Sequence, residues 1–143
     1  MASIAEQVRI ALYGKLNVAG VTTYVSTRIF NLVPATSPAY PFIVFQRQAP
    51  GNVDYTLSGA TAVEDDLWLI KAITTEDDNS SYSPQELADL ILSACQTAIG
   101  TTMTLSANTV VWCRRFADIP PFVEATTDRL VYTHGFLLRV AAE

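Results

Sequence analysis

The sequence has few of the residues from which metal and catalytic sites are built. His134 is the only histidine, and the two cysteines, Cys95 and Cys113, lie far apart with no Cys-x-x-Cys spacing. A metal site made from several histidines or from paired cysteines is therefore excluded, and we expect both thiols to be buried and reduced. A Ser-His-Asp arrangement would have to use His134. No Gly-x-Ser-x-Gly elbow supports one, so a half-buried structural histidine is the better interpretation.

Phosphate-binding glycine motifs are absent as well. The six glycines are scattered, and neither a Walker-type loop nor a Gly-x-Gly-x-x-Gly run occurs. The carboxylate pairs Asp65/Asp66 and Asp77/Asp78 are adjacent in sequence, so on an extended chain their side chains point to opposite faces. They are poorly placed for joint acid-base work or for holding Mg²⁺. The sequence predicts no catalytic residue, no cofactor and no metal.

Basic residues are also few. Nine lysines and arginines stand against fourteen aspartates and glutamates, which gives a net charge of −5. Binding to DNA phosphates needs a basic surface, so this balance argues against a DNA-binding domain. No stretch is long enough to cross a bilayer, and the N-terminus lacks the basic start and apolar centre of a signal peptide. We therefore expect no membrane contact and a chain that stays in the cytoplasm where it is made.

Apolar residues, in contrast, are abundant. Half of the residues are hydrophobic, only 16% are charged, and the mean hydropathy is +0.24. A chain of 143 residues is long enough to bury a core as one domain. Such an apolar composition favours an oligomer over a solitary monomer.

Residues 40–47 are predicted to form the strand around which the fold is organised. Pro41 keeps the preceding residues out of a helix, and large β-favouring side chains follow it. Phe42 and Val44 then point to one face of the sheet, while Ile43 and Phe45 point to the other. This pattern indicates an inner strand with one face on helices. We expect a second copy of the chain to cover the other face.

Two Ser-x-x-Glu capping boxes, at Ser3 and Ser83, predict helices over residues 3–16 and 83–99. The run over residues 21–33 is β-branched, and a Pro-Pro pair indicates an irregular linker over residues 118–127. Further strands are expected at residues 28–30, 62–75, 108–116 and 128–140, with projecting loops at 51–61 and 76–82.

The order α-β-β-β-α-β-β predicts the fold class. It indicates an α+β fold, a single domain over residues 1–143, with two helices packed on one face of a mostly antiparallel β-sheet.

This order of elements resembles the tail-completion and tail-terminator proteins of long-tailed bacteriophages. The resemblance covers nearly the whole chain and rests on pattern and length rather than on an invariant motif. Its residues are the first helix ending at Leu16, Arg28-Ile29-Phe30, the proline-led strand 40–47, the acidic-led strand 64–74, the capped helix 83–99 and the last strand with Arg139.

The resemblance implies a structural virion protein of the tail and neck, assembled in the host cytoplasm. Proteins of this family form a ring, usually a hexamer, at the head-proximal end of the tail tube. The ring ends tube polymerisation and joins the tail to the head. The implied partners are other copies of the chain, the tail-tube protein and a head-connector or adaptor protein, while genomic DNA passes through the lumen without specific binding.

In such a ring, the apolar strand would supply part of the subunit interface, through Phe42, Val44 and Phe45. Arg114 and Arg115 are adjacent on a predicted strand, so they cannot both face the core. We expect one of them to pair with a carboxylate of the neighbouring subunit.

Acidic residues could line the lumen of the ring and repel DNA phosphates, so that the genome slides through. The equally weighted alternative is that they only keep loops soluble. The acids expected at the lumen are Asp54, Glu64, Asp65, Asp66, Asp77 and Asp78.

Other functions stay open at this point. Another neck component, such as a head-completion or connector-adaptor protein, has a similar size. A small-molecule-binding α+β domain of a bacterial cell would need convergent polar groups in an apolar pocket. An enzyme ranks third, because no nucleophile, metal site or phosphate loop is visible.

Overall fold

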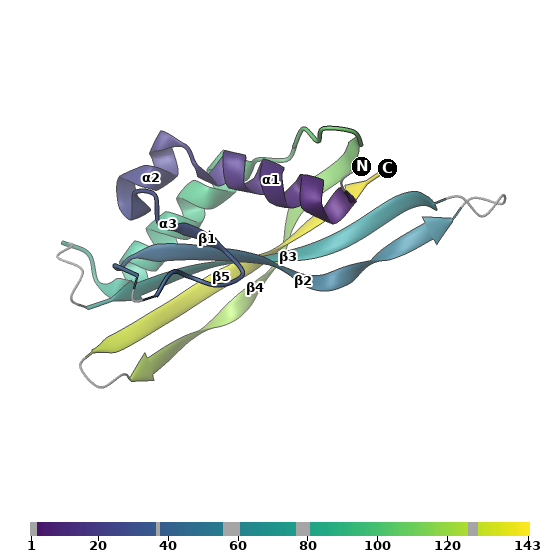
Figure 1. Ribbon diagram of the computed structural model, residues 1–143. Coiled ribbons are helices and arrows are strands. Elements are labelled where there is room, and N and C mark those ends of the chain that lie inside the picture. The colour runs from purple at the N-terminus through teal and green to yellow at the C-terminus, as the bar shows by residue number, and fades with distance from the viewer. Residues whose placement is uncertain (1–2, 37, 56–60, 77–80, 126–128) are drawn as a thin grey trace.

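The computed structural model describes residues 3–36, 38–55, 61–76, 81–125 and 129–143, with residues 49–55 and 61–62 described by their backbone only. Within these ranges the chain forms three helices and five strands (Figure 1). In chain order they are α1 (Ile4–Leu16), α2 (Ala19–Val25), β1 (Ile29–Asn31), β2 (Phe42–Tyr55), β3 (Thr61–Thr75), α3 (Pro84–Ile99), β4 (Val110–Ala125) and β5 (Leu130–Ala142).

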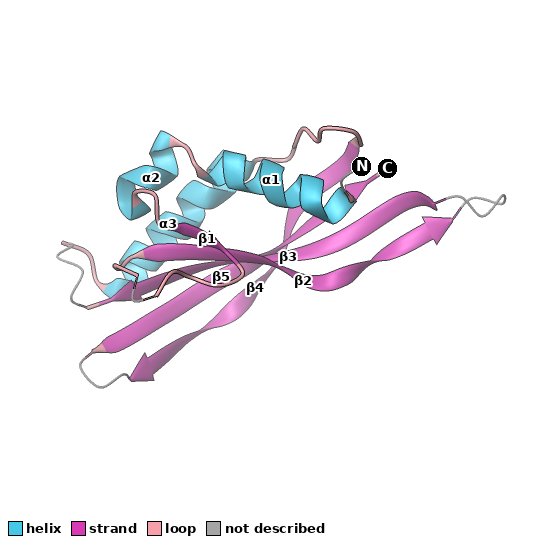
Figure 2. Cartoon of the chain, in the orientation of Figure 1, coloured by secondary structure: helices cyan, strands magenta, loops and turns pink. Residues whose placement is uncertain are grey.

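The strands form one sheet in the order β1-β2-β3-β5-β4. Strand β1 runs parallel to β2, and every other pair is antiparallel. All three helices lie on the same side of this sheet (Figure 2). The predicted α+β fold is confirmed, with three helices on one face instead of two.

Both predicted helix starts are confirmed. The Ser3 hydroxyl accepts a hydrogen bond from the Glu6 backbone N–H at 3.2 Å, and the Ser83 hydroxyl accepts one from the Glu86 N–H at 3.3 Å. These bonds satisfy backbone donors that the first helical turn leaves without a partner. Helix α3 ends at Gly100, whose φ of +64° lies in the region that favours glycine.

The core lies between the helices and the sheet. Alternate residues of β2, β3 and β5 point toward the helices, among them Phe45, Ile70 and Phe136, each at most 1% exposed. Helix α3 packs on β3 and β5, and α1 and α2 pack beside it. Strand β4, at the edge of the sheet, is only partly under this cover: Cys113 is buried in the core, whereas Phe116 and Phe122 are about half exposed.

A buried glutamine fixes where β4 begins. The Gln7 side chain of α1 accepts a hydrogen bond from the Ala107 backbone N–H at 2.9 Å and donates one to the Asn108 side chain at 2.8 Å. The Asn108 amide in turn donates to the backbone carbonyl of Glu143 at 3.1 Å. These bonds tie the segment before β4 to the first helix and to the end of β5.

The β-branched run before β1 is a helix, where no helix was predicted. Helix α2 buries Val21 and Val25, which lie four residues apart on one face. The Thr23 hydroxyl donates to the Ala19 carbonyl at 2.7 Å within the same helix. Burial of two valines in the tertiary core therefore outweighs the β preference of this segment.

Two segments expected to be irregular are largely strand. Of the expected loop at 51–61, residues 51–55 belong to β2 and Thr61 belongs to β3, and the remaining residues lie outside the described part. The expected loop at 76–82 falls mostly outside it as well. The expected linker at 118–127 continues β4 to Ala125, with a register shift between Ile119 and Phe122. An edge strand accommodates the two prolines there because it needs no N–H on its outer side.

Candidate functional site: the surface around strand β4

Residues 42–45 of β2, the strand expected to lie at the centre of the fold, are buried on both faces by their own chain. Phe45 is 1% exposed beneath the helices, and Phe42 and Val44 are 6% and 3% exposed on the other face. Their cover comes from Phe30 and Tyr40, whose rings lie 5.9 and 5.3 Å from that of Phe42. The expectation that a second copy supplies this cover is wrong, because segments flanking the strand fold back over it.

Three of the predicted lumen acids, Glu64, Asp65 and Asp66, are held in ion pairs within the chain. The Arg139 Nε donates to both carboxylate oxygens of Asp65 at 3.0 and 2.9 Å. The Arg47 Nη2 donates to Asp66 at 2.7 Å, and the Asp66 side chain is only 1% exposed. Asp66 is therefore no surface acid. The side chains of Asp54, Asp77 and Asp78 lie outside the described residues.

Glu64 stays short of positive charge. Glu64 and Asp66 share the guanidinium of Arg47. The distance from Arg47 Nη2 to Glu64 Oε1 is 3.3 Å, longer than the 2.7 Å to Asp66 Oδ1, and the Glu64 side chain is 22% exposed. Burial raises the pKa of Glu64, the nearby Asp66 carboxylate raises it further, and Arg47 only partly opposes these effects. Two carboxylates and one guanidinium leave a surplus negative charge on the helix-side face of the β2–β3 hairpin.

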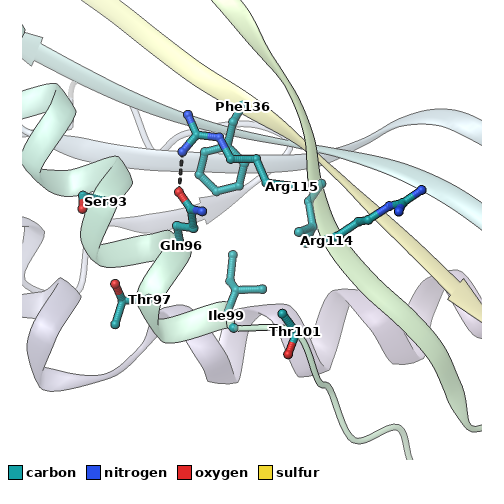
Figure 3. A pocket seen from close by; sticks show the side chains of 10 residues that line it. Ser93, Gln96, Thr97, Ile99, Thr101, Arg114, Arg115 and Phe136 are labelled. Carbon is teal, nitrogen blue, oxygen red and sulfur yellow. Dashed lines mark hydrogen bonds between the residues drawn. The ribbon is translucent and has the colours of Figure 1, made fainter.

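The two adjacent arginines of β4 lie on opposite faces of the sheet, as strand alternation requires. Arg115 faces the helix side, where its guanidinium bonds to Asp118, at 2.7 Å through Nε, and to the Gln96 side chain (Figure 3). The same guanidinium lies 4.8 Å from the centre of the Phe136 ring. Arg115 therefore links α3 to β4 and is already paired within the chain.

Arg114 belongs to an arginine–aromatic cluster on the open face, made of Trp112, Arg114, Phe116 and Arg139. The guanidinium of Arg114 lies 4.7 Å from the centre of the Trp112 ring system. That of Arg139 lies 4.9 Å from Trp112 and 5.6 Å from Phe116. Arg139 is paired with Asp65, whereas no carboxylate of the described residues pairs with Arg114. Tryptophan and arginine are the residue types that dominate binding energy at protein interfaces.

The sequence interpretation identified Arg114 but missed the aromatic members of this cluster. Phe116 is in fact 53% exposed, and Phe122 and Val123 further along β4 are 52% and 59% exposed. These side chains are exposed because β4 is an edge strand. The order of strands in the sheet could not be read from the sequence, so the sequence held no signal for their exposure.

A groove of about 630 Å³ separates α3 from β4 (Figure 3). Its floor is the buried pair Phe136 and Leu138, and its walls carry Gln96, Thr97 and Arg115. The charged group that spans it, Arg115, is already bonded to Asp118 and Gln96. The uncharged polar side chains that line the groove are Gln96 and the hydroxyl-bearing Ser93, Thr97 and Thr101.

The chemistry-bearing side chains elsewhere are structurally engaged. His134 lies 3.1 Å from the Asp89 carboxylate and is half-buried, as predicted. Cys95 and Cys113 are free and buried, and burial raises the pKa of their thiols to about 12 and about 11. Among the residues described, no group of three or more His, Cys, Asp or Glu side chains could hold a metal ion. None of the helices found in the described ranges has the length and hydrophobicity to cross a membrane.

Comparison with known proteins finds the same fold in a virus-like particle. No protein-family model and no curated protein matches the sequence. A chain in the solved virion of the native gene transfer agent (GTA) particle matches with a TM-score of 0.70 and 17% sequence identity. The match covers 100% of this chain and 99% of that chain. The two chains therefore share one fold from end to end.

Proposed function

We propose that the chain is a structural virion protein that forms a ring at the head-proximal end of a phage tail tube. The ring ends polymerisation of the tube and joins the tail to the head connector. The observation that carries the proposal is the end-to-end fold shared with a chain of a virion particle. The order of elements, which resembles tail-terminator proteins, supports the finer assignment.

The surface of β4 supports assembly with other protein chains. Exposed apolar side chains gathered on one strand favour contact with another protein. Along β4, Val111, Phe116, Phe122 and Val123 are each about half exposed. Strand β4 is also the longest element at an edge of the sheet. A ring contact on this side is heterologous and must close by rotation.

Of the two arginines predicted at the subunit interface, Arg114 is the better candidate. Arg115 already holds Asp118 and Gln96, so its charge is compensated within the chain. The exposed Arg114 lies over the Trp112 ring, and no carboxylate of the described residues pairs with it. A carboxylate of the neighbouring subunit would complete its hydrogen bonds. Phe42, Val44 and Phe45 are buried and drop out of the proposed interface.

The proposed acidic lumen keeps only part of its predicted residues. Asp65 and Asp66 are neutralised by Arg139 and Arg47. Asp54, Asp77 and Asp78 remain the candidates that repel DNA. Replacing these three with lysine should slow DNA ejection and leave ring assembly intact. Unchanged ejection kinetics would remove this part of the proposal.

The proposal is tested by assembly. The purified chain is measured by native mass spectrometry and negative-stain imaging, where annular particles are expected. It is then added to polymerising tail-tube protein, where shorter tubes capped at one end are expected. A chain that stays monomeric at all concentrations would contradict the ring. Rings that leave tube length unchanged would instead favour another neck component.

A further inference from the structure

Two unbalanced charges lie on opposite faces of the sheet. Arg114 is the surplus cation on the open face, where Arg139 is matched by Asp65. Glu64 is the surplus anion on the helix-side face, where Arg47 serves both Glu64 and Asp66. Because the sheet separates them, these two side chains cannot meet within one chain. A second copy can bring them together.

The receiving surface around Glu64 lies next to the first turns of α1. A groove lined by Ala5 and Arg9 of α1 reaches Arg47 and Trp68. Glu64 lies four residues before Trp68, about 13 Å farther along the strand. The β2–β3 hairpin continues past the helix layer in this direction (Figure 1). The Glu64 side chain, which is 22% exposed, can therefore be reached by another protein surface.

The two surfaces also match in their apolar parts. Phe116 projects from the open face of β4 and is 53% exposed. Beside Arg47, the partner of Glu64, the groove of about 240 Å³ is lined by Leu32 and Trp68. Glu6, Arg9 and Arg47 also line this groove, so its apolar part is Ala5, Leu32 and Trp68. An exposed aromatic anchor that fills such an apolar part is the arrangement found at protein interfaces.

We propose that copies of the chain assemble head to tail, with the open face of β4 on one copy lying on the helix-side face of the β2–β3 hairpin of the next. In this contact Arg114 pairs with Glu64 of the neighbouring copy, and Phe116 enters the groove beside Arg47. The contact is heterologous, since each copy uses two different surfaces, and it can therefore repeat around a ring. The inference rests on the proposed ring function and names its subunit contact.

A charge-swap cycle tests the pairing. The variants are Arg114→Glu, Glu64→Arg and the double variant, and the concentration for half-assembly is measured by mass photometry. Each single reversal should raise that concentration at least about tenfold, and the double variant should recover most of the loss. Glu76→Arg serves as the matched control, because Glu76 is exposed and follows the end of β3 that lies away from Glu64. If Glu64→Arg fails to fold, Glu64→Gln replaces it as a single variant only. It should weaken assembly of the wild-type Arg114 chain, and unchanged assembly would overturn the pairing.

Cross-linking tests the head-to-tail geometry. In a chain that carries both Arg114→Cys and Glu64→Cys, oxidation should produce a ladder of linked chains that ends at the ring. The native Cys95 and Cys113 are buried, and the pKa values of their thiols are raised to about 12 and about 11, so they provide a low background. Linkage that stops at two chains would indicate a two-fold contact and overturn the inference.

The outcomes separate this inference from the proposed function. If the wild-type chain forms rings and both single reversals assemble equally well, the Arg114–Glu64 contact is wrong while the ring stands. A double variant no better than the singles would also overturn the pairing. A wild-type chain that never assembles would overturn both.

Discussion

Phenylalanines in two regions of the sheet have opposite surroundings. Beneath the helices, Phe45 and Phe136 are 1% and 0% exposed, whereas on β4 Phe116 and Phe122 are 53% and 52% exposed. The difference follows from the placement of α3, which packs on β3 and β5 and leaves much of β4 beyond its edge. One region holds the chain together, and the other is left with its apolar side chains in solvent.

The contrast indicates where each kind of residue acts. Side chains under the helices contribute to the free energy of unfolding, because their burial is complete within one chain. Side chains on β4 contribute little to it, and their hydrophobic surface is available to a partner. Each of the following variants tests one part of this division.

The largest expected difference is between the same substitution in the two regions. Phe45→Ala should lower the free energy of unfolding by about 3–5 kcal/mol, because it leaves a cavity in the core. Phe116→Ala should lower it by no more than about 0.5 kcal/mol, because the side chain is half in solvent. Urea denaturation of the dilute monomer measures both values. Equal losses would show that β4 is covered in solution.

Gly135 tests how tightly β5 is packed on the open face. A Cβ at this position would lie 2.5 Å from the backbone oxygen of Ile70 and 3.1 Å from Ile119 Cδ1. Gly135→Ala should therefore destabilise the fold by about 1–3 kcal/mol, because backbone has to move. Gly14→Ala is the control. No atom lies within 4 Å of the added Cβ in α1, and the helix should gain about 0.5–1 kcal/mol. Thermal melting distinguishes the two, and a stabilised Gly135→Ala would contradict the packing.

A smaller effect is expected at the start of α3. Ser83→Ala removes the acceptor for the Glu86 N–H and should cost about 1 kcal/mol. Ser93→Ala, at an exposed position inside the same helix, should be neutral or slightly stabilising. Chemical denaturation of both variants provides the comparison. Equal stability of the two would mean that the cap does not fix the helix start.

The smallest effect depends on pH and concerns Glu64. Its pKa is raised above 4.5 in the fold, so its contribution to stability is present below pH 4.5 and is lost as pH rises through the raised pKa. Glu64→Gln should therefore raise the melting temperature of the monomer at pH 7 and leave it nearly unchanged at pH 4. Assembly should respond in the opposite direction at pH 7, because the neutral side chain cannot pair with Arg114. A variant less stable than wild type at pH 7 would contradict the charge surplus.

Features set by neighbouring residues were predictable from sequence. Ser3 and Ser83 mark helix starts because an N-cap bonds a backbone N–H only a few residues away. The alternation over 42–45 and 62–75 places side chains correctly, because a strand fixes it locally. Pro120 and Pro121 led to the wrong prediction of an irregular linker at 118–127. A proline pair would end an inner strand, but it is tolerated here because β4 is an edge strand.

The sequence by itself determined the caps, the strand alternation, the α+β order and the absence of motifs for metal or phosphate. Only the tertiary structure decided which apolar faces the chain covers for itself. Phe42 and Val44 are sheltered by Phe30 and Tyr40, while Phe116 is left in solvent. The physical reason is that local bonds fix the direction of a side chain, whereas its burial depends on segments distant in sequence that fold over it.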